Sequence, residues 1–304
     1  MTPNLTPVDA FGRLDADRLR NYLEWLIDRG VDGIYVNGST GEFNRLSEAV
    51  QYEAVRTAAT VAAGRLPVVA GVVAGVVGDV SAVRTCLRRY AELAVRAAAV
   101  LPPTYLPVSP AGVGDYLDAL LTDAPVDVVL YNIPQFASAI TPDVLAELVG
   151  RHRRVIGMKD SSGDVAGLGR LIDAARDRRE TFVALNGWDP VMTAAAAIGC
   201  DGGTNATSGV IPEVTRALHR SCADGRFADA RRLQRLVTGV FDACGAVDDF
   251  PRGYRIAVKY RGIDLGDGPL PTRREPPSSQ IEAIHRAVDA ALDDPLVRTP
   301  ASAS

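Results

Sequence analysis

Short apolar runs alternate with longer segments of helical periodicity along most of this chain, and this alternation constrains the fold more than any other feature. The runs consist of β-branched or small apolar residues and lie at Ile34–Val36, Val68–Val72, Ala98–Leu101, Val128–Leu130, Val155–Met158, Phe182–Leu185 and Cys200–Thr204. A strand that is apolar along its whole length is typical of a parallel sheet whose faces are covered by helices. We therefore expect an α/β fold with a parallel sheet.

The segments between these runs carry the signals of amphipathic helices. Apolar residues recur at helical spacing over residues 19–27. Ser47 stands where the N-cap of a second helix is expected, and Thr141 followed by Pro142 is typical of a third helix start. Each apolar run is thus followed by a segment that can return the chain to the start of the next parallel strand.

An eighth strand is expected within Thr2–Val8, which completes a set of eight strand–helix units. Eight such units in about 220 residues are the size of a (β/α)8 TIM barrel. A doubly wound sheet is the alternative, but no GxGxxG motif follows the first strand. We predict a (β/α)8 TIM barrel that spans residues 1–224.

The alternation stops after Glu213, and the remaining sequence is mostly helical in pattern. Helices are expected over Phe227–Cys244, Tyr254–Gly262 and Ser279–Leu292, with a Pro-rich linker before the last of them. We predict that residues 225–304 form a C-terminal helical region packed on the barrel. The final residues, Thr299–Ser304, are expected to be disordered.

The charge balance and the rare residues exclude several classes of function. The net charge is −4 and the pI about 5.5, which disfavours binding to nucleic acid or to an anionic membrane. The most apolar stretch, Leu66–Val77, is too short to span a bilayer, and we expect no signal peptide because the N-terminus lacks a charged region followed by an apolar one. The cysteines and histidines form no metal-ligand spacing, so we expect no metal, free thiols and a cytoplasmic location.

Polar residues gather where the expected strands end. The apolar runs are followed by Asn37–Glu42, Pro102–Tyr105, Tyr131–Pro134, Lys159, Asn186–Asp189 and Thr204–Thr207. In a (β/α)8 barrel the carboxyl ends of the strands form one face, and the active site is built there. We therefore expect these residues to converge on a single active-site mouth.

Lys159 is the most informative of these residues. Only two of the 33 cationic side chains are lysines, the other being Lys259, for which we expect a structural or interface role. A buried lysine that loses its proton can attack a ketone and form a Schiff base, whereas arginine stays protonated. A salt bridge with Asp160 is the structural alternative, but neighbouring strand residues point to opposite faces. We predict that Lys159 is a nucleophile.

Tyr131 and the glycine loop that precedes it in the chain suggest acid–base chemistry and anion binding. A phenol beside Lys159 can donate and accept protons, with ordinary core packing as the alternative. The loop "GSTG" offers backbone N–H groups and the hydroxyls of Ser39 and Thr40 to a carboxylate or a phosphate, unless it is an ordinary connection. For Tyr105, Ser161 and Asp189, a role in binding and a structural role are equally open.

Five segments together resemble the dihydrodipicolinate synthase / N-acetylneuraminate lyase family of pyruvate-dependent class I aldolases. They are "GSTGEFNRLS" from Gly38, "PPTY" from Pro102, "YNIP" from Tyr131, "GMKDSSGD" from Gly157 and "GCDGGTNAT" from Gly199. The resemblance covers nearly the whole chain. It implies a barrel with a C-terminal helical region, a homotetramer built as a dimer of dimers, and pyruvate and an aldehyde as substrates. It implies no cofactor, because the substrate forms a Schiff base with the enzyme's own lysine.

The resemblance also assigns roles to particular residues. Lys159 matches the Schiff-base lysine, and Tyr131 the acid–base tyrosine beside it. Ser39 matches the proton-relay hydroxyl and, with Thr40, the pair that binds the pyruvate carboxylate. Tyr105 matches a tyrosine that some members lend across a subunit interface. The expected substrate-binding residues are Gly38, Thr40, Ser161, Gly187, Asp189 and Thr204.

Three departures from the family pattern bear on the substrate. Phe136 stands where the synthases place an arginine for a substrate carboxylate. Pro190 replaces the acidic residue that follows Asp189 in sialic acid lyases. Ser161 is a hydroxyl, as in sugar-acid aldolases, where the synthases usually have alanine. These departures favour an aldolase for a 2-keto-3-deoxy acid, such as 2-keto-3-deoxygluconate.

Several alternatives to this activity stay open. The first group uses the same imine and comprises a 4-hydroxy-tetrahydrodipicolinate synthase, an N-acetylneuraminate lyase-type enzyme and a sugar-acid dehydratase. The other is a ligand-binding regulator that has lost turnover, which the presence of both Lys159 and Tyr131 disfavours. The length and stereochemistry of the acceptor aldehyde are not fixed by the sequence.

Overall fold

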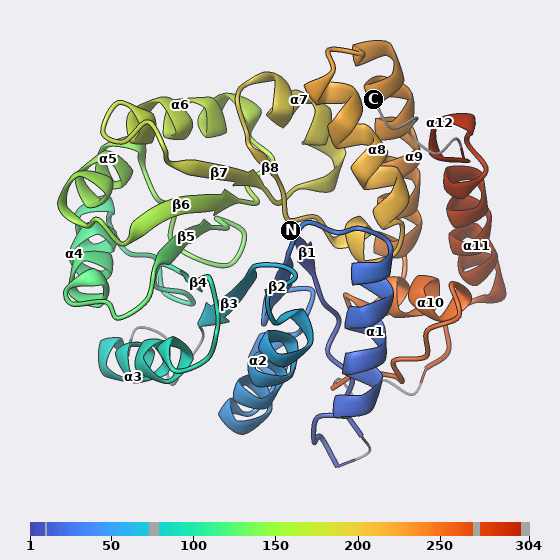
Figure 1. The fold of residues 1–304 in the computed structure, drawn as a ribbon, viewed down its shortest axis with the longest axis horizontal. Helices are drawn as coiled ribbons and strands as arrows, with labels where there is room; N and C mark the ends of the chain where they lie inside the picture. Colours follow the sequence, from blue (N-terminus) through green and yellow to red (C-terminus); the bar gives the residue numbers. More distant parts are fainter. Residues whose placement is uncertain (10, 73–78, 270–273, 299–304) are drawn as a thin grey trace.

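The computed structural model describes residues 1–9, 11–72, 79–269 and 274–298, and its strands form one parallel sheet (Figure 1). The strands are β1 (Thr2–Pro3), β2 (Ile34–Val36), β3 (Val68–Val72), β4 (Ala97–Val100), β5 (Val128–Asn132), β6 (Val155–Asp160), β7 (Val183–Asn186) and β8 (Gly202–Gly203). They pair in sequence order from β1 to β8. The α-amino group of Met1 donates to the carbonyl of Gly203 at 3.0 Å, so the first and last strands lie side by side. The predicted (β/α)8 barrel is confirmed.

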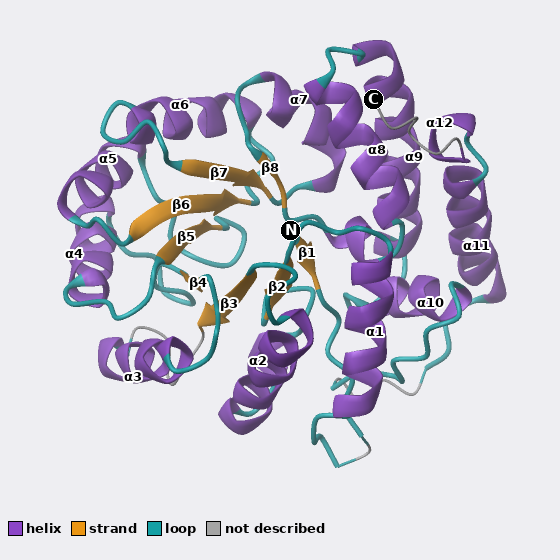
Figure 2. Cartoon of the chain, viewed as in Figure 1, coloured by secondary structure: helices purple, strands orange, loops and turns teal. Residues whose placement is uncertain are grey.

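Helices follow the strands and surround the sheet, as Figure 2 shows. Around the barrel lie α1 (Ala16–Asp28), α2 (Glu48–Ala62), α3 (Val80–Ala91), α4 (Pro110–Leu121), α5 (Pro142–Arg151), α6 (Val165–Arg176), α7 (Met192–Ala197) and α8 (Pro212–Ala223), with short 3-10 turns η1 (Phe43–Arg45), η2 (Asp189–Val191) and η3 (Ala206–Gly209). The predicted N-caps are confirmed: Ser47 accepts a hydrogen bond from the N–H of Val50, and Thr141 from that of Val144.

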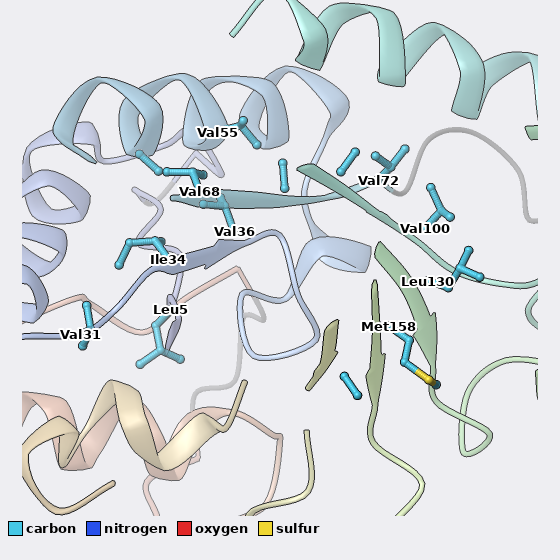
Figure 3. Packing of buried hydrophobic residues seen from close by; sticks show 14 of the residues in the cluster. Leu5, Val31, Ile34, Val36, Val55, Val68, Val72, Val100, Leu130 and Met158 are labelled. Atoms are coloured by element: carbon cyan, nitrogen blue, oxygen red, sulfur yellow. The ribbon is translucent and has the colours of Figure 1, made fainter. Parts of the chain in front are cut away.

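The main core lies between the strands and the helices. Figure 3 shows part of it, including Ile34 and Val36 of β2, Val68 of β3 and Val55 of α2. Successive strand residues point to opposite faces of the sheet. The strand residues that alternate with those of the main core therefore face the barrel interior. Five of them form a separate apolar cluster: Tyr35, Val69, Ala97, Ala99 and Val129. This alternation places the inward positions of β5 and β6 at Tyr131 and Lys159.

The strands β5 and β6 are longer than their apolar runs. The sequence ends these runs at Leu130 and Met158, but the ladder continues through the pairs Tyr131↔Lys159 and Asn132↔Asp160. Backbone hydrogen bonding between parallel strands does not depend on side-chain polarity, so polar residues extend both strands. Tyr131 and Lys159 therefore sit on regular strand backbone rather than in the loops that follow.

The helices after the barrel pack along one side of it, at the right of Figure 1. They are α9 (Phe227–Gly245), α10 (Arg252–Tyr260), α11 (Ser278–Leu292) and α12 (Pro295–Arg298), so the predicted C-terminal helical region is confirmed. α9 packs on α8 and α11, and the side chains that it buries include Leu233, Val237 and Val240. The division at residues 224 and 225 into two units stays a prediction.

The C-terminal end of the chain and the cysteines were the subject of two further predictions. The expected disorder of Thr299–Ser304 lies outside the described residues. All four cysteines are free thiols, as expected. Among the helices of the described ranges, none combines the length and the apolar character that crossing a membrane requires.

Candidate active site

Lys159 and Tyr131 stand side by side on paired strands and point into the barrel. Lys159 is 5% exposed, and its Nζ lies 4.1 Å from the centroid of the Tyr131 ring and 4.6 Å from that of Tyr35. The rings of Tyr35 and Tyr131 meet edge to face at 6.3 Å. A lysine amine is thus held between two aromatic rings, whose faces attract its cationic form.

Asp160 points away from this group. Its Oδ2 accepts a hydrogen bond from Asn132 Nδ2 at 2.5 Å, and its Oδ1 accepts from the N–H and the hydroxyl of Ser162. Asn132 in turn accepts from the N–H of Ile140. Strand alternation therefore separates the carboxylate of Asp160 from Lys159. The hydrogen bonds of Asp160 and Asn132 instead hold the segments that follow β5 and β6.

The phenol of Tyr131 is the centre of a small network of hydroxyl groups. Tyr131 is 3% exposed, and its oxygen lies 3.5 Å from Ser39 Oγ and 3.4 Å from Ser161 Oγ. Burial opposes ionisation of the phenol, but the Lys159 ammonium and the hydrogen bonds from Ser161 and Ser39 together outweigh it. The pKa of Tyr131 therefore lies below its ordinary value.

Tyr35 behaves in the opposite way. Burial raises the pKa of Tyr35 well above its ordinary value, and the neighbouring Tyr131 raises it further. Its phenol therefore stays protonated, whereas that of Tyr131 ionises more readily. The two adjacent tyrosines thus have pKa values moved in opposite directions, and Tyr131 is the one that ionises more readily.

The loop after β2 presents unpaired donors next to Tyr131. Asn37 adopts positive φ, and its amide donates to the carbonyl of Gln51 and the hydroxyl of Tyr90, which anchors the start of the loop. Within the described part of the chain, the backbone N–H groups of Ser39 and Thr40 donate to no acceptor. Consecutive free N–H groups in a turn form a concave site for an anion.

Two glycines at the site allow close approach of other groups. A Cβ at Gly38 would lie 2.7 Å from a ring carbon of Tyr35. A Cβ at Gly187 would lie 2.7 Å from Cε of Lys159 and 2.1 Å from Oγ of Ser161. The N–H of Gly187 donates to the carbonyl of Asp160 at 2.6 Å. Gly187 therefore leaves the space that the Lys159 side chain occupies.

The residues after β7 and β8 differ in their availability. Asp189 is 2% exposed and accepts hydrogen bonds from the N–H and the hydroxyl of Thr207 and from the N–H of Ala206. Burial raises the pKa of Asp189, although these hydrogen bonds oppose the shift. The structure thus gives Asp189 a role in holding the loop after β8. By contrast, Thr204 Oγ1 is buried and has no partner among the described residues.

Tyr105 lies apart from the other candidates. It follows β4, has a backbone φ of 69°, and is 91% exposed on the single chain. An isolated bridge joins its neighbour Thr104 to Ala137, which brings the loops after β4 and β5 together. The single chain therefore does not bring Tyr105 together with Lys159 and Tyr131.

A large cavity among the described residues opens at the other end of the barrel. It measures about 760 Å³ and is lined at the strand starts by Val69, Ala97, Val129, Gly157 and Val183. Neither Lys159 nor Tyr131 lines it. The candidate active site is therefore defined by its converging side chains at the carboxyl ends of the strands.

Tyr35 is the residue at this site that the sequence did not single out. It lies within an apolar run and reads as a core residue. The available signal was its position in the strand. Ile34 and Val36 point outward to the helices, so Tyr35 between them points into the barrel. Its contact with Lys159 could not be foreseen, since β2 and β6 are not neighbours in the sheet.

Comparison with known proteins gives one consistent result. The dihydrodipicolinate synthetase family model matches residues 1–293. A probable 2-dehydro-3-deoxy-D-pentonate aldolase of Escherichia coli is 28% identical over 225 residues, 74% of each chain. A 4-hydroxy-tetrahydrodipicolinate synthase of Xanthomonas axonopodis is 30% identical over 295 residues, 95% of each chain. The solved structure of a dihydrodipicolinate synthase from Bacillus anthracis has a TM-score of 0.87 at 25% identity, covering 95% of this chain and 96% of that one.

Proposed function

The chain belongs to the dihydrodipicolinate synthetase family and is a class I aldolase or lyase, and we propose that its substrate is a 2-keto-3-deoxy sugar acid. The products of cleavage are pyruvate and a neutral hydroxyaldehyde, and the reverse reaction joins them. Family members act on pyruvate and aldehydes through a lysine Schiff base.

Imine formation begins with attack of the Lys159 amine on the C2 ketone. Tyr131 lies within reach of this amine, and its lowered pKa makes the phenolate that accepts the amine's proton easier to form. The same phenol then protonates the carbinolamine hydroxyl, which leaves as water. The ring contact and the pKa direction together support Tyr131 as the acid–base group of this step.

Carbon–carbon cleavage uses the iminium as an electron sink. Loss of the proton from the C4 hydroxyl breaks the C3–C4 bond, and its electron pair moves to the iminium to give an enamine and an aldehyde. The enamine is protonated at C3, and water then hydrolyses the imine to release pyruvate and the Lys159 amine. Tyr131, hydrogen-bonded to Ser39 and Ser161, is placed to move these protons.

The substrate carboxylate is assigned to the loop after β2. The N–H groups of Ser39 and Thr40, which donate to no acceptor among the described residues, and the hydroxyls of these two residues offer donors without a fixed positive charge. Ser39 also contacts Tyr131, so a carboxylate at this loop holds the adjacent C2 ketone beside the acid–base group. Thr204, whose hydroxyl has no partner among the described residues, is a further donor or acceptor for the substrate.

The neutrality of the loop after β5 is the observation that carries the choice of substrate. Phe136 is 68% exposed there, and no residue from Ile133 to Thr141 is cationic. The amide of Gln135 is occupied by the carbonyls of Ser161 and Ser162. The loop therefore offers no cationic side chain to pair with a second carboxylate on the acceptor, and a neutral hydroxyaldehyde calls for none. The hydroxyl of Ser161, in contact with Tyr131, supports the same choice.

A 4-hydroxy-tetrahydrodipicolinate synthase is the second candidate, because a relative with that name is similar over 95% of the chain. A panel of aldehydes with pyruvate separates the two. We expect glyceraldehyde or glycolaldehyde to give a higher kcat/KM than aspartate semialdehyde, with the product identified by mass spectrometry. The Phe136→Arg variant should shift this preference toward aspartate semialdehyde. A wild-type preference for aspartate semialdehyde would reject the sugar-acid proposal.

The pH dependence of imine formation tests the role of Ser161. Its hydroxyl donates to Tyr131 and lowers the pKa of that phenol. Removing this donor in Ser161→Ala destabilises the phenolate and so raises the pKa of Tyr131. If the phenolate takes the proton from Lys159, the rate rises with pH through this pKa, and the rise should move to higher pH in the variant. Single-turnover rates with pyruvate across the pH range measure this.

Ser162→Ala is the matched control for that experiment. The hydroxyl of Ser162 donates to Asp160 rather than to Tyr131. We therefore expect its pH profile to rise where the wild-type profile does. A profile that does not move in Ser161→Ala would show that Tyr131 is not the group that limits the rate.

A homotetramer is proposed on the basis of the resemblance and of the exposed residues at the mouth. Tyr105, Leu106 and Phe136 are between 68% and 91% exposed on a single chain. Exposed apolar side chains of this size are typical of a surface that another protein covers. Light scattering coupled to size-exclusion chromatography should give the mass of four chains, and a monomer mass would contradict the proposal.

A further inference from the structure

The loop that carries Ser39 and Thr40 is attached to the C-terminal helical region by a buried ion pair. Glu42, at the end of this loop, is 3% exposed, and Arg255 of α10 is 5% exposed. Arg255 Nε lies 3.1 Å from Glu42 Oε2, and the Nη2 of Arg255 bonds the same oxygen. Nη2 also donates to the carbonyl of Thr6 at 2.7 Å. One guanidinium thus joins α10, the loop and the segment after β1.

Glu42 belongs to the same turn as the residues that bind the carboxylate. The N–H of Glu42 donates to the carbonyl of Ser39 at 3.0 Å, and that of Gly41 to the carbonyl of Gly38. Glu42 itself has a left-handed backbone with φ of 58°. This conformation is unfavourable for a residue with a long side chain and persists where surrounding contacts enforce it. A shift of Glu42 therefore displaces the peptide groups of Ser39 and Thr40.

The second oxygen of the Glu42 carboxylate is held by Arg45. Arg45 Nη1 lies 2.8 Å from Glu42 Oε1 and also 2.8 Å from the carbonyl of Phe250, which precedes α10. The loop is therefore fastened to the C-terminal region at two points. Loss of Arg255 leaves Arg45 as the remaining cation at Glu42 and leaves Oε2 buried without its partner, which favours a shift of Glu42 toward water or toward Arg45.

The guanidinium of Arg255 is itself covered by backbone. Gly268, in the segment between α10 and α11, has φ of 86°, and a Cβ there would lie 2.5 Å from Arg255 Nε. Only a glycine allows the chain to pass this close. The guanidinium of Arg255 is therefore in contact with Glu42 and close to the backbone of Gly268, which together restrict its position.

We propose that Arg255 is a positioning residue for the substrate carboxylate, acting through Glu42 on the N–H groups of Ser39 and Thr40. The C-terminal helical region thereby sets the geometry of a site that lies in the barrel. This inference rests on the proposed function, because it assumes that the loop binds the carboxylate of pyruvate.

The test compares two ketones that differ in the carboxylate. Pyruvate and acetone are each trapped on the enzyme with borohydride, and the second-order rate constant of trapping at Lys159 is measured by mass spectrometry. Arg255→Met should lower the rate constant for pyruvate by about 10- to 100-fold, the loss typical of a misplaced binding group. The rate constant for acetone should stay near that of the wild type, since acetone has no carboxylate to position.

Arg261→Met is the matched control. Arg261 follows α10 and is 11% exposed in an ion pair of 2.7 Å with Glu213, but this pair does not touch the loop after β2. Its loss should lower the melting temperature while the ratio of the two rate constants stays unchanged. Arg255→Lys keeps a cation near Glu42 without the guanidinium fork, and it should give an intermediate ratio.

The outcomes separate the inference from the function on which it rests. If the wild type is not trapped by pyruvate at Lys159, the proposed function fails. If the wild type is trapped and folded Arg255→Met keeps its pyruvate-to-acetone ratio, the positioning role is wrong. An equal fall for both ketones would also reject it. Should Arg255→Met not fold, the ratio in Arg255→Lys decides, and a wild-type ratio there overturns the proposal.

Discussion

Replacing Lys159 by arginine is expected to abolish both turnover and the covalent capture of pyruvate. Arginine keeps the positive charge between the rings of Tyr35 and Tyr131, but its guanidinium does not lose a proton and cannot form an imine. Loss of a covalent nucleophile lowers kcat by about 10⁴-fold or more. The measurements are steady-state kinetics with pyruvate and an aldehyde, and borohydride trapping followed by mass spectrometry.

The chain offers an unusually direct control for this variant. Lys259 is the other lysine and lies exposed at the end of α10. Lys259→Arg should keep wild-type turnover and trapping. The backbone at Gly187 passes close to the Lys159 side chain and leaves little room for the larger arginine. Lys159→Met, whose side chain is similar in volume to lysine, therefore serves as a second variant. Appreciable turnover in either folded Lys159 variant would contradict the assigned nucleophile.

Replacing Tyr131 by phenylalanine should produce the second largest effect. The ring and its contact with Lys159 are kept, but the group that moves protons is lost, along with its hydrogen bonds to Ser39 and Ser161. Removal of a general acid–base group typically lowers the rate by about 10²- to 10⁴-fold. We expect this loss in kcat for the aldol reaction and in the single-turnover rate of imine formation.

Tyr35→Phe is the comparison that distinguishes proton transfer from packing. Its phenol is also buried and also lies beside Lys159, but burial raises its pKa so that it stays protonated. The variant should therefore lose far less activity than Tyr131→Phe. Equal losses in the two variants would show that the Tyr131 hydroxyl does nothing that the Tyr35 hydroxyl does not, and the acid–base assignment of Tyr131 would be wrong.

The barrel was predictable because each strand and helix is encoded locally. Continuous apolar runs mark strands that are buried on both sides, and residues such as Ser47 and Thr141 mark the starts of helices. Strand ends were less accurate, since polar residues such as Tyr131 and Lys159 extend a ladder that the apolar runs do not reveal. The convergence of Lys159 and Tyr131 followed from the barrel itself, whose strands end on one face.

The contacts that could not be predicted join segments far apart in the sequence. Arg255 reads as a polar residue of an amphipathic helix, and nothing in its neighbours indicates that Glu42, 213 residues away, is its partner. Asp189 reads as a candidate for binding hydroxyls, but the loop after β8 folds back and occupies its carboxylate. Such partners depend on loop conformation, which is set by tertiary packing and not by local periodicity.

Mapping the adduct formed by pyruvate and borohydride on the wild-type protein is the most direct test of the central claim. Lys159 and Lys259 are the two lysines of the chain, so peptide mass spectrometry can assign the adduct to one of them without ambiguity. The account predicts a reduced pyruvate adduct on Lys159 and none on Lys259. Folded protein that carries no adduct on Lys159 after saturating pyruvate and borohydride would contradict it.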